Sequence, residues 1–278
     1  MMNLAEYRRT ATRLADYLPW AALVAPGIVL NKDGSFQRTA RFRGPDLDSA
    51  VAAELVAVVG RINNALRRLG SGWAIFVEAQ RNEAETYPDS TFPDPASALV
   101  DAERKAAFEE AGAHFVSEYF LTFLWLPPAE EAARTEAWLY EGRDKAGVDP
   151  GELLRSFIDR TDRVLALLDG FMPECRWLDD AGTLTYLHST ISTNRHRIRV
   201  PEVPMYLDAL LADQPLTGGL EPRLGDAHLR ILTIVGFPTA TTPGVLDELN
   251  RLAFPYRWST RAILMDKTEA ARLLTKIR

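Results

Sequence analysis

The chain has 278 residues, of which 47% are hydrophobic and 25% are charged, and this composition excludes a largely disordered protein and gives room for about two domains. Its formal net charge of -6 excludes a surface that is basic throughout, but residues 1–43 and 256–278 each carry +4 and the residues between them -14. Basic ends on an acidic body suit docking to a partner or to anionic lipid, and solvated surface charge is the alternative.

In the first half of the chain, the hydrophobic pattern predicts a sheet with helices on one face. A β-hairpin is expected around Asn31-Lys32-Asp33-Gly34, because Asp-Gly supplies the positive φ of a tight turn. The predicted strands are 28–30, 35–43, 73–77 and 119–126, and the predicted helices are 3–17, 47–69 and 96–112.

The second half of the chain predicts a further α+β unit. Residues 128–149 are charged and rich in alanine, and we expect a helical connector there. The predicted strands are 174–178, 205–211, 229–235 and 256–265, and the predicted helices are 151–169 and three that begin near Asp180, Thr242 and Asp266. The last helix reaches Arg278 without a glycine or proline that would end it, which suggests a longer protein.

The expected fold class is therefore α+β, with two subdomains of mainly antiparallel or mixed sheets, each covered by helices. The first subdomain is predicted over residues 1–127 and the second over 150–278. A single cysteine, Cys175, excludes an internal disulfide, and its partly apolar neighbours predict a buried thiol. The two longest uncharged runs, 17–31 and 231–246, are interrupted by proline and glycine and are too short to cross a bilayer.

No group of residues in the sequence has the pattern of an active site. The Gly-x-x-x-x-Gly-Lys-[Ser/Thr] phosphate loop does not occur, and Gly70-Ser71-Gly72 stands between a helix and a strand in the reverse of the P-loop order. The four histidines are scattered without metal-site spacing, and paired acids fit solvated helix faces and N-caps. We therefore expect no catalytic, cofactor-binding or metal-binding residues, and no enzyme activity in this chain.

Two basic stretches are candidate contacts for a partner or for DNA. Arg195, Arg197 and Arg199 alternate along the chain, which places them on one side of an extended segment. Arg257 and Arg261 share a predicted strand with aromatic residues that could stack on bases. The structural alternatives are an exposed loop with local salt bridges and arginines that cover a sheet edge.

Apolar residues between 17 and 30 exceed what one hairpin strand needs, so an apolar docking patch is expected there. The candidate docking residues are Leu18, Trp20, Leu23 and Val24.

Several stretches resemble one known family. Residues 3–8, 14–20, 25–46 and 65–73 resemble the start of the TrbE branch of the CagE/TrbE/VirB family of type IV secretion ATPases. Tyr-Arg-Trp-Ser-Thr-Arg at 256–261 resembles a later motif of the same family. The resemblance thus runs from the first residues nearly to the last.

This resemblance implies a role in conjugal DNA transfer, in the bacterial cytoplasm at the periphery of the inner membrane. In such ATPases the N-terminal part docks onto inner-membrane subunits and helps to form an oligomer, commonly a hexamer, while a RecA-like domain binds ATP and Mg²⁺. This sequence lacks that domain, so no cofactor is expected here. A docking and oligomerisation domain is the expected function, and a nucleic-acid-binding module is the alternative.

Overall fold

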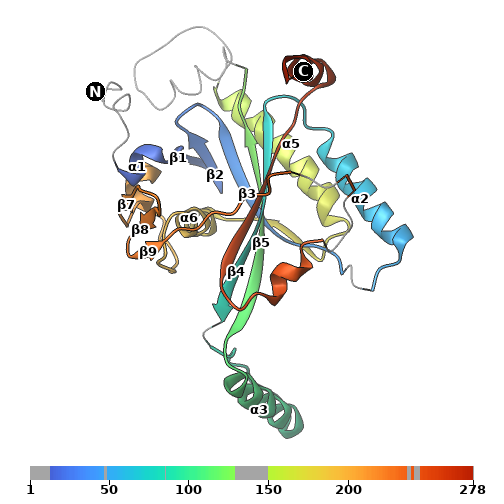
Figure 1. Ribbon diagram of the computed structural model, residues 1–278, viewed down its shortest axis with the longest axis vertical. Helices are drawn as coiled ribbons and strands as arrows, with labels where there is room; N and C mark the ends of the chain where they lie inside the picture. Colours follow the sequence, from blue (N-terminus) through green and yellow to red (C-terminus); the bar gives the residue numbers. More distant parts are fainter. Residues whose placement is uncertain are drawn as a thin grey trace.

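The computed structural model describes residues 13–46, 49–84, 86–128, 150–236, 239–240 and 245–277. The predicted connector, from residue 129 on, and most of the predicted helix over 3–17 lie outside the described residues. Within them, helices cover both faces of one seven-stranded sheet, and a small three-stranded sheet lies beside it (Figure 1). The predicted α+β fold class is confirmed.

All pairs in the large sheet are antiparallel, in the order β1-β2-β3-β5-β4-β10, with β6 paired to β3. Its strands are β1 Trp20–Ala25, β2 Ile28–Asn31, β3 Phe36–Arg43, β4 Trp73–Ala84, β5 His114–Trp125, β6 Glu174–Trp177 and β10 Tyr256–Ile263. The small sheet contains β7 Leu216–Thr217, β8 Arg223–Leu224 and β9 Ala227–His228. The helices are α1 Leu14–Tyr17, α2 Ala52–Leu66, α3 Pro95–Glu110, α5 Pro150–Asp169, α6 Asp180–Ser189, α7 Leu207–Leu211, the 3-10 helix η2 Asp247–Arg251 and α8 Lys267–Ile277.

The predicted hairpin is confirmed as β2 and β3. Gly34 has a φ of +83° in the turn, and the Asp33 carboxylate accepts a hydrogen bond from the Ser35 backbone N–H at 3.0 Å. An aspartate side chain that bonds its own backbone two residues on is a common way to close such a turn. The sequence therefore determined this turn locally.

A second hairpin, formed by β1 and β2, was missed by the sequence analysis. Gly27 has a φ of +68° there, and a Cβ atom at this position would lie 2.3 Å from the carbonyl oxygen of Leu178. Its N–H donates a hydrogen bond to the Asp180 carboxylate at 2.6 Å. Only glycine fits both the backbone conformation and this contact, so Gly27 brings the β1–β2 hairpin against the start of α6.

The central strands of the sheet are buried on both faces. Along β5, Leu121 and Phe123 pack into a core that includes residues of α2 and α5, whereas Phe120 packs with residues of α6 and α7 on the opposite face. Side chains alternate in this way because successive residues of a strand point to opposite faces. The sequence predicted helices on one face, but α6 and α7 from the second half of the chain cover the other.

The core on the α5 side contains a stack of four aromatic rings. Phe157 of α5 is fully buried, and its ring lies 5.6 Å from the rings of Phe36 and Trp73 and 6.4 Å from that of Trp125, at small angles to all three. Offset aromatic pairs at such distances add stability beyond the burial of their surface. This stack joins α5, from the second half of the chain, to three strands from the first.

Strands from the second half also complete the large sheet. Glu174–Trp177 pairs with β3, and Tyr256–Ile263 pairs with β4 over its whole length. The two predicted subdomains therefore share one sheet, and the position of a domain boundary stays a prediction. Two predicted strands were also too short, because β4 and β5 each have 12 residues.

Two predicted strands of the second half are wrong. Residues 205–211 contain helix α7, in which Leu207 and Leu211 are four positions apart and both buried, the spacing of one helical face. Residues 229–235 form no strand, and Leu232 and Val235 have exposed fractions of 95% and 100%. The small sheet ends at His228, so these residues pair with no described strand. Of the helix expected from Thr242, the structure describes only the short η2.

The far ends of β4 and β5 carry α3 away from the sheet (Figure 1). Asp94 is the N-cap of this helix and accepts hydrogen bonds from the Ser97 backbone N–H at 2.8 Å and from its hydroxyl at 2.7 Å. Proline follows at the first helical position, and no residue of α3 is buried. The helix is thus stabilised by its own cap and exposes most of its surface.

The prediction that Cys175 is a buried thiol is confirmed. It lies in β6 with an exposed fraction of 6%, and burial raises the pKa of the thiol to about 11. Because the thiolate is the reactive form, this side chain is a weak nucleophile near neutral pH.

We expect Phe157→Ala to lower the free energy of unfolding by about 3–5 kcal/mol, because it leaves a cavity among three aromatic rings. Urea denaturation followed by tryptophan fluorescence measures this change. Leu167→Ala on the same helix is the control, since Leu167 is 38% exposed, and we expect it to cost about 1 kcal/mol or less. Equal effects of the two substitutions would contradict the central role of the stack.

Candidate functional site

A buried carboxylate in the middle of β4 joins three elements. Glu78 of β4 is 7% exposed and forms an ion pair with Arg257 of β10. It also accepts hydrogen bonds from the Tyr186 hydroxyl of α6 at 3.2 Å and from the Gln80 amide at 2.8 Å. The Arg257 guanidinium donates a further hydrogen bond to the carbonyl of Ser189. A buried charge with this many partners is stable, and each partner fixes its own element in place.

The Tyr186 hydroxyl is a hydrogen-bond donor in this network over the whole physiological range. Burial raises its pKa far above the ordinary value, and the neighbouring Glu78 carboxylate raises it further. Its ring packs against Phe120 of β5 with 4.5 Å between the centroids. The tyrosine therefore holds α6 against the sheet through both its ring and its hydroxyl.

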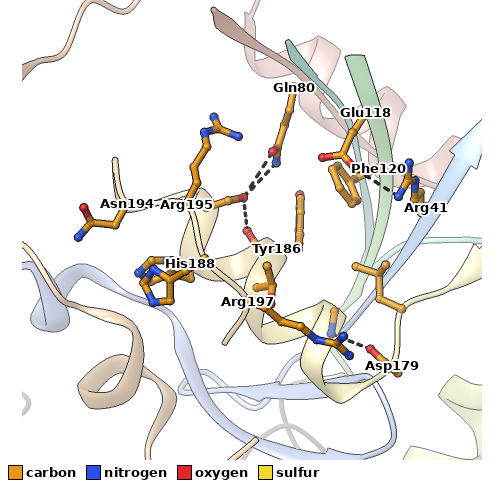
Figure 2. Close-up of a pocket in the computed structure, with 15 residues that line it drawn as sticks. Arg41, Gln80, Glu118, Phe120, Asp179, Tyr186, His188, Asn194, Arg195 and Arg197 are labelled. Atoms are coloured by element: carbon orange, nitrogen blue, oxygen red, sulfur yellow. Dashed lines mark hydrogen bonds and ion pairs between the residues drawn. The ribbon is translucent and has the colours of Figure 1, made fainter. Parts of the chain in front are cut away.

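A cavity of about 410 Å³ opens beside this network (Figure 2). Arg41 of β3, Gln80 of β4 and Glu118 of β5 line one side, and α6 and residues 194–197 line the other. Arg41 forms an ion pair with Glu118 at 3.2 Å. Segments that are far apart in the sequence thus meet at one concave surface.

The segment 194–197 is held against α6 by hydrogen bonds. The Asn194 amide donates to the Asp213 carboxylate at 2.8 Å, and the Ser192 hydroxyl donates to it at 3.0 Å. Although burial opposes them, these bonds, with help from His188, hold the pKa of Asp213 below its usual value. His188, 2% exposed, lies 3.1 Å from the same carboxylate and stacks edge-on with His196, with 4.7 Å between the rings. The loop is therefore fixed at its base, and its arginines extend from an ordered backbone.

The five arginines proposed from the sequence do not form one surface. Arg195 and Arg197 line the cavity, whereas Arg199 does not. Arg257 is held in the Glu78 network, with a side chain 28% exposed. Arg261 is exposed further along the edge strand β10. Contact of these arginines with a partner or with DNA stays a prediction.

The candidate docking residues near the N-terminus lie mostly inside the fold. Leu18 and Trp20 are 5% and 7% exposed and pack in the core between the sheet and α7. Leu23 and Val24 are partly buried against the cores of opposite faces. Docking through Leu23 and Val24 stays a prediction, but the apolar length of this stretch is explained by the unpredicted strand β1.

The residues that sequence reasoning missed are Arg41, Glu78, Gln80 and Glu118. Glu78 had a detectable signal, because a single carboxylate follows an unbroken apolar run, Trp73 to Val77, of a predicted interior strand. The other three are ordinary polar positions in strands, and only the sheet register brings them together.

Within the described residues, His, Cys, Asp and Glu side chains form no group of three or more that could hold a metal ion. In the same part of the chain, every helix is too short or too polar to cross a membrane.

Comparison with known proteins places the sequence among relatives. Residues 27–133 match the family model described as the N-terminal domain of the type IV secretion system ATPase VirB4/TrbE. The whole chain aligns with the conjugal transfer protein TrbE of Rhizobium radiobacter at 32% identity and covers 36% of that protein. It is also 41% identical to a shorter relative, the first of two segments of the probable conjugal transfer protein TrbE of Sinorhizobium fredii. That match extends over 49% of this chain and 93% of the shorter relative.

A more distant match is the type IV secretion system protein virB4 of Brucella suis, 23% identical over 95% of this chain and 34% of that protein. The chain therefore spans about a third of the length of the two longer relatives, from Rhizobium radiobacter and Brucella suis.

We expect Arg257→Ala to lower the free energy of unfolding by about 2–4 kcal/mol, because it leaves the Glu78 carboxylate buried without its cationic partner. Arg261→Ala on the same strand is the control, and we expect a change within about 0.5 kcal/mol. Combining Arg257→Ala with Glu78→Gln should recover part of the loss, since the amide carries no charge. A double variant that is no more stable than Arg257→Ala would show that the ion pair is not the cause.

Proposed function

Because this chain belongs to the VirB4/TrbE family of type IV secretion ATPases and corresponds to their N-terminal domain, we propose that it attaches the motor to inner-membrane subunits of the transfer apparatus. In this proposal the domain lies at the periphery of the membrane and helps the parent protein to form its oligomer. ATP and Mg²⁺ are then bound by the remainder of the parent.

The exposed segment Ile231–Val235 supports docking most directly. Ile231, Leu232 and Val235 are 79%, 95% and 100% exposed, and Leu220 is also fully exposed. Adjacent exposed apolar side chains in a globular protein mark interaction surfaces. The composition of this segment predicts a strand, yet it pairs with no described strand. Such a segment fits a partner that adds its own strand beside it.

The placement of the arginines makes nucleic-acid binding the weaker candidate. A protein that tracks a DNA backbone presents a continuous row of cations to successive phosphates. Arg257 is paired with Glu78, and the exposed side chains of Arg195 and Arg197 extend to opposite ends of a cavity (Figure 2). Docking to a protein partner therefore explains more of the exposed side chains than DNA binding does.

We expect the tagged chain to capture the small inner-membrane subunit of the same conjugation system from detergent extracts. Replacing Leu232 and Val235 by glutamate should weaken this capture by at least about tenfold, because charged groups cannot be buried at an apolar contact. Both side chains are fully exposed, so the fold should not change. Leu99→Glu on α3 is the control, being 65% exposed at the far end of the β4 and β5 strands (Figure 1).

Light scattering of the purified chain measures self-association in the same experiment, against a monomer mass of 31.0 kDa. Failure to capture the subunit, together with a strictly monomeric chain, would contradict the proposal. Loss of capture by Leu99→Glu alone would place the docking face on α3 and refute the role of Ile231–Val235.

A further inference from the structure

The first half of α2 presents apolar side chains to solvent. Val56 is 72% exposed, and Val59 on the next turn is 59% exposed. Ile62 and Ala65 pack into the core from the side of the helix that faces away from Val56. A Cβ atom added at Gly60 would meet no atom within 4 Å, so the space over this face is open. Because a helix that is apolar beyond its core side is normally covered by another element, this face can receive one.

The same face of α2 ends in a positive charge. Arg67 follows Val56 by eleven residues, or about three helical turns, so the two side chains lie on one face. The Arg67 guanidinium is exposed at the C-terminal end of the helix and forms no ion pair with any described residue. The helix dipole favours a cation there. This face of α2 is therefore apolar at its start and basic at its end.

The outer face of α3 has the same spacing with the opposite charge. Leu99 is 65% exposed, and the exposed Glu110 follows it by eleven residues on the same face. The basic residues of α3, Arg104 and Lys105, lie on other sides of the helix by the same geometry. This face of α3 is thus apolar at its start and acidic at its end.

The acidic end of α3 has an uncompensated charge. Glu110 is the last residue of the helix, the last turn contains no basic residue, and the helix dipole disfavours an anion at this end. The helix is held from the side opposite to Leu99, where the ring of Phe108 stacks on that of His114 with 3.9 Å between the centroids. A cation brought to the outer face from elsewhere would therefore stabilise this end without disturbing the contact that holds the helix.

The two helices match each other from start to end. If Val56 is set against Leu99 in a parallel pair, the helices begin side by side and Arg67 lies beside Glu110. An antiparallel pair would instead separate these two charges by the length of the helices. Within one molecule the faces do not meet, because α2 lies beside α5 and α3 lies at the far ends of β4 and β5 (Figure 1).

We propose that α2 of one copy of the chain packs in parallel against α3 of a second copy, with Val56 against Leu99 and Arg67 paired with Glu110. Each copy offers one α2 and one α3, so the contact is heterologous and continues from copy to copy into a ring or a filament. The inference rests on the self-association proposed above and gives it a surface, which is separate from the docking segment Ile231–Val235.

The test is sedimentation velocity of the 278-residue chain over a range of concentrations. We expect the mass to rise above the 31.0 kDa of one chain as the concentration increases. Val56→Glu or Leu99→Glu should weaken this association at least about tenfold, because either places a charge at the apolar contact. Lys105→Glu, on another side of α3, is the control and should associate as the unchanged chain does. Thermal melts of all variants establish that the fold is retained.

Mixing the two glutamate variants distinguishes this contact from a symmetric one. The Val56→Glu chain keeps its α3 face and the Leu99→Glu chain keeps its α2 face. An equimolar mixture should therefore form complexes of two chains, although each variant alone stays monomeric. A mixture that stays monomeric overturns the inference, and so does association that survives both substitutions.

Exchange of the charges tests the register. Arg67→Glu or Glu110→Arg alone should weaken association, and the two substitutions in one chain should restore it, because the pair is then reversed. Absence of recovery overturns the parallel pairing. An unchanged chain that stays monomeric yet captures the inner-membrane subunit overturns this inference alone and leaves the docking proposal standing.

Discussion

The stacked rings of Phe36, Trp73, Trp125 and Phe157 fix the relation between the two halves of the chain. Three of these residues belong to strands of the first half, and the fourth lies on α5 of the second. Once α5 is packed there, the chain after it is positioned to add β6 to β3 and to start α6 near Gly27. The opposite face of the sheet, the Glu78 network and the cavity all depend on that placement.

Local chemistry determined much of this fold in advance. The Asp-Gly turn, the helix starts near residues 96 and 180, and the apolar periodicity of α2 and α5 are readable from short windows of sequence. The sequence analysis was wrong where a short apolar stretch fits both the spacing of a strand and that of a helix, as in α7. It was also wrong where a strand depends on a partner that is distant in the sequence. Residues 229–235 have the composition of a strand, but composition alone cannot show whether another strand lies beside them. Within the described residues, they pair with none.

The candidate site was far less predictable than the fold. Arg195 and Arg197 were identified as a basic cluster, yet the cavity that they line is completed by residues of β3, β4 and β5. The ion pair between Glu78 and Arg257 joins residues 179 positions apart. No periodicity or motif reports such contacts, because they depend on the order and register of strands in the sheet. What the sequence could show was membership of the family, through long matching stretches.

The central claim is the proposal that this domain acts by docking onto other subunits of the transfer apparatus. It is tested most directly by producing the 278-residue chain in donor cells that also contain the intact secretion ATPase, and measuring the frequency of conjugal transfer. A domain that docks by itself should compete with the intact ATPase, so transfer should fall as the amount of the chain rises. Unchanged transfer in cells that contain an excess of the folded chain would contradict the claim.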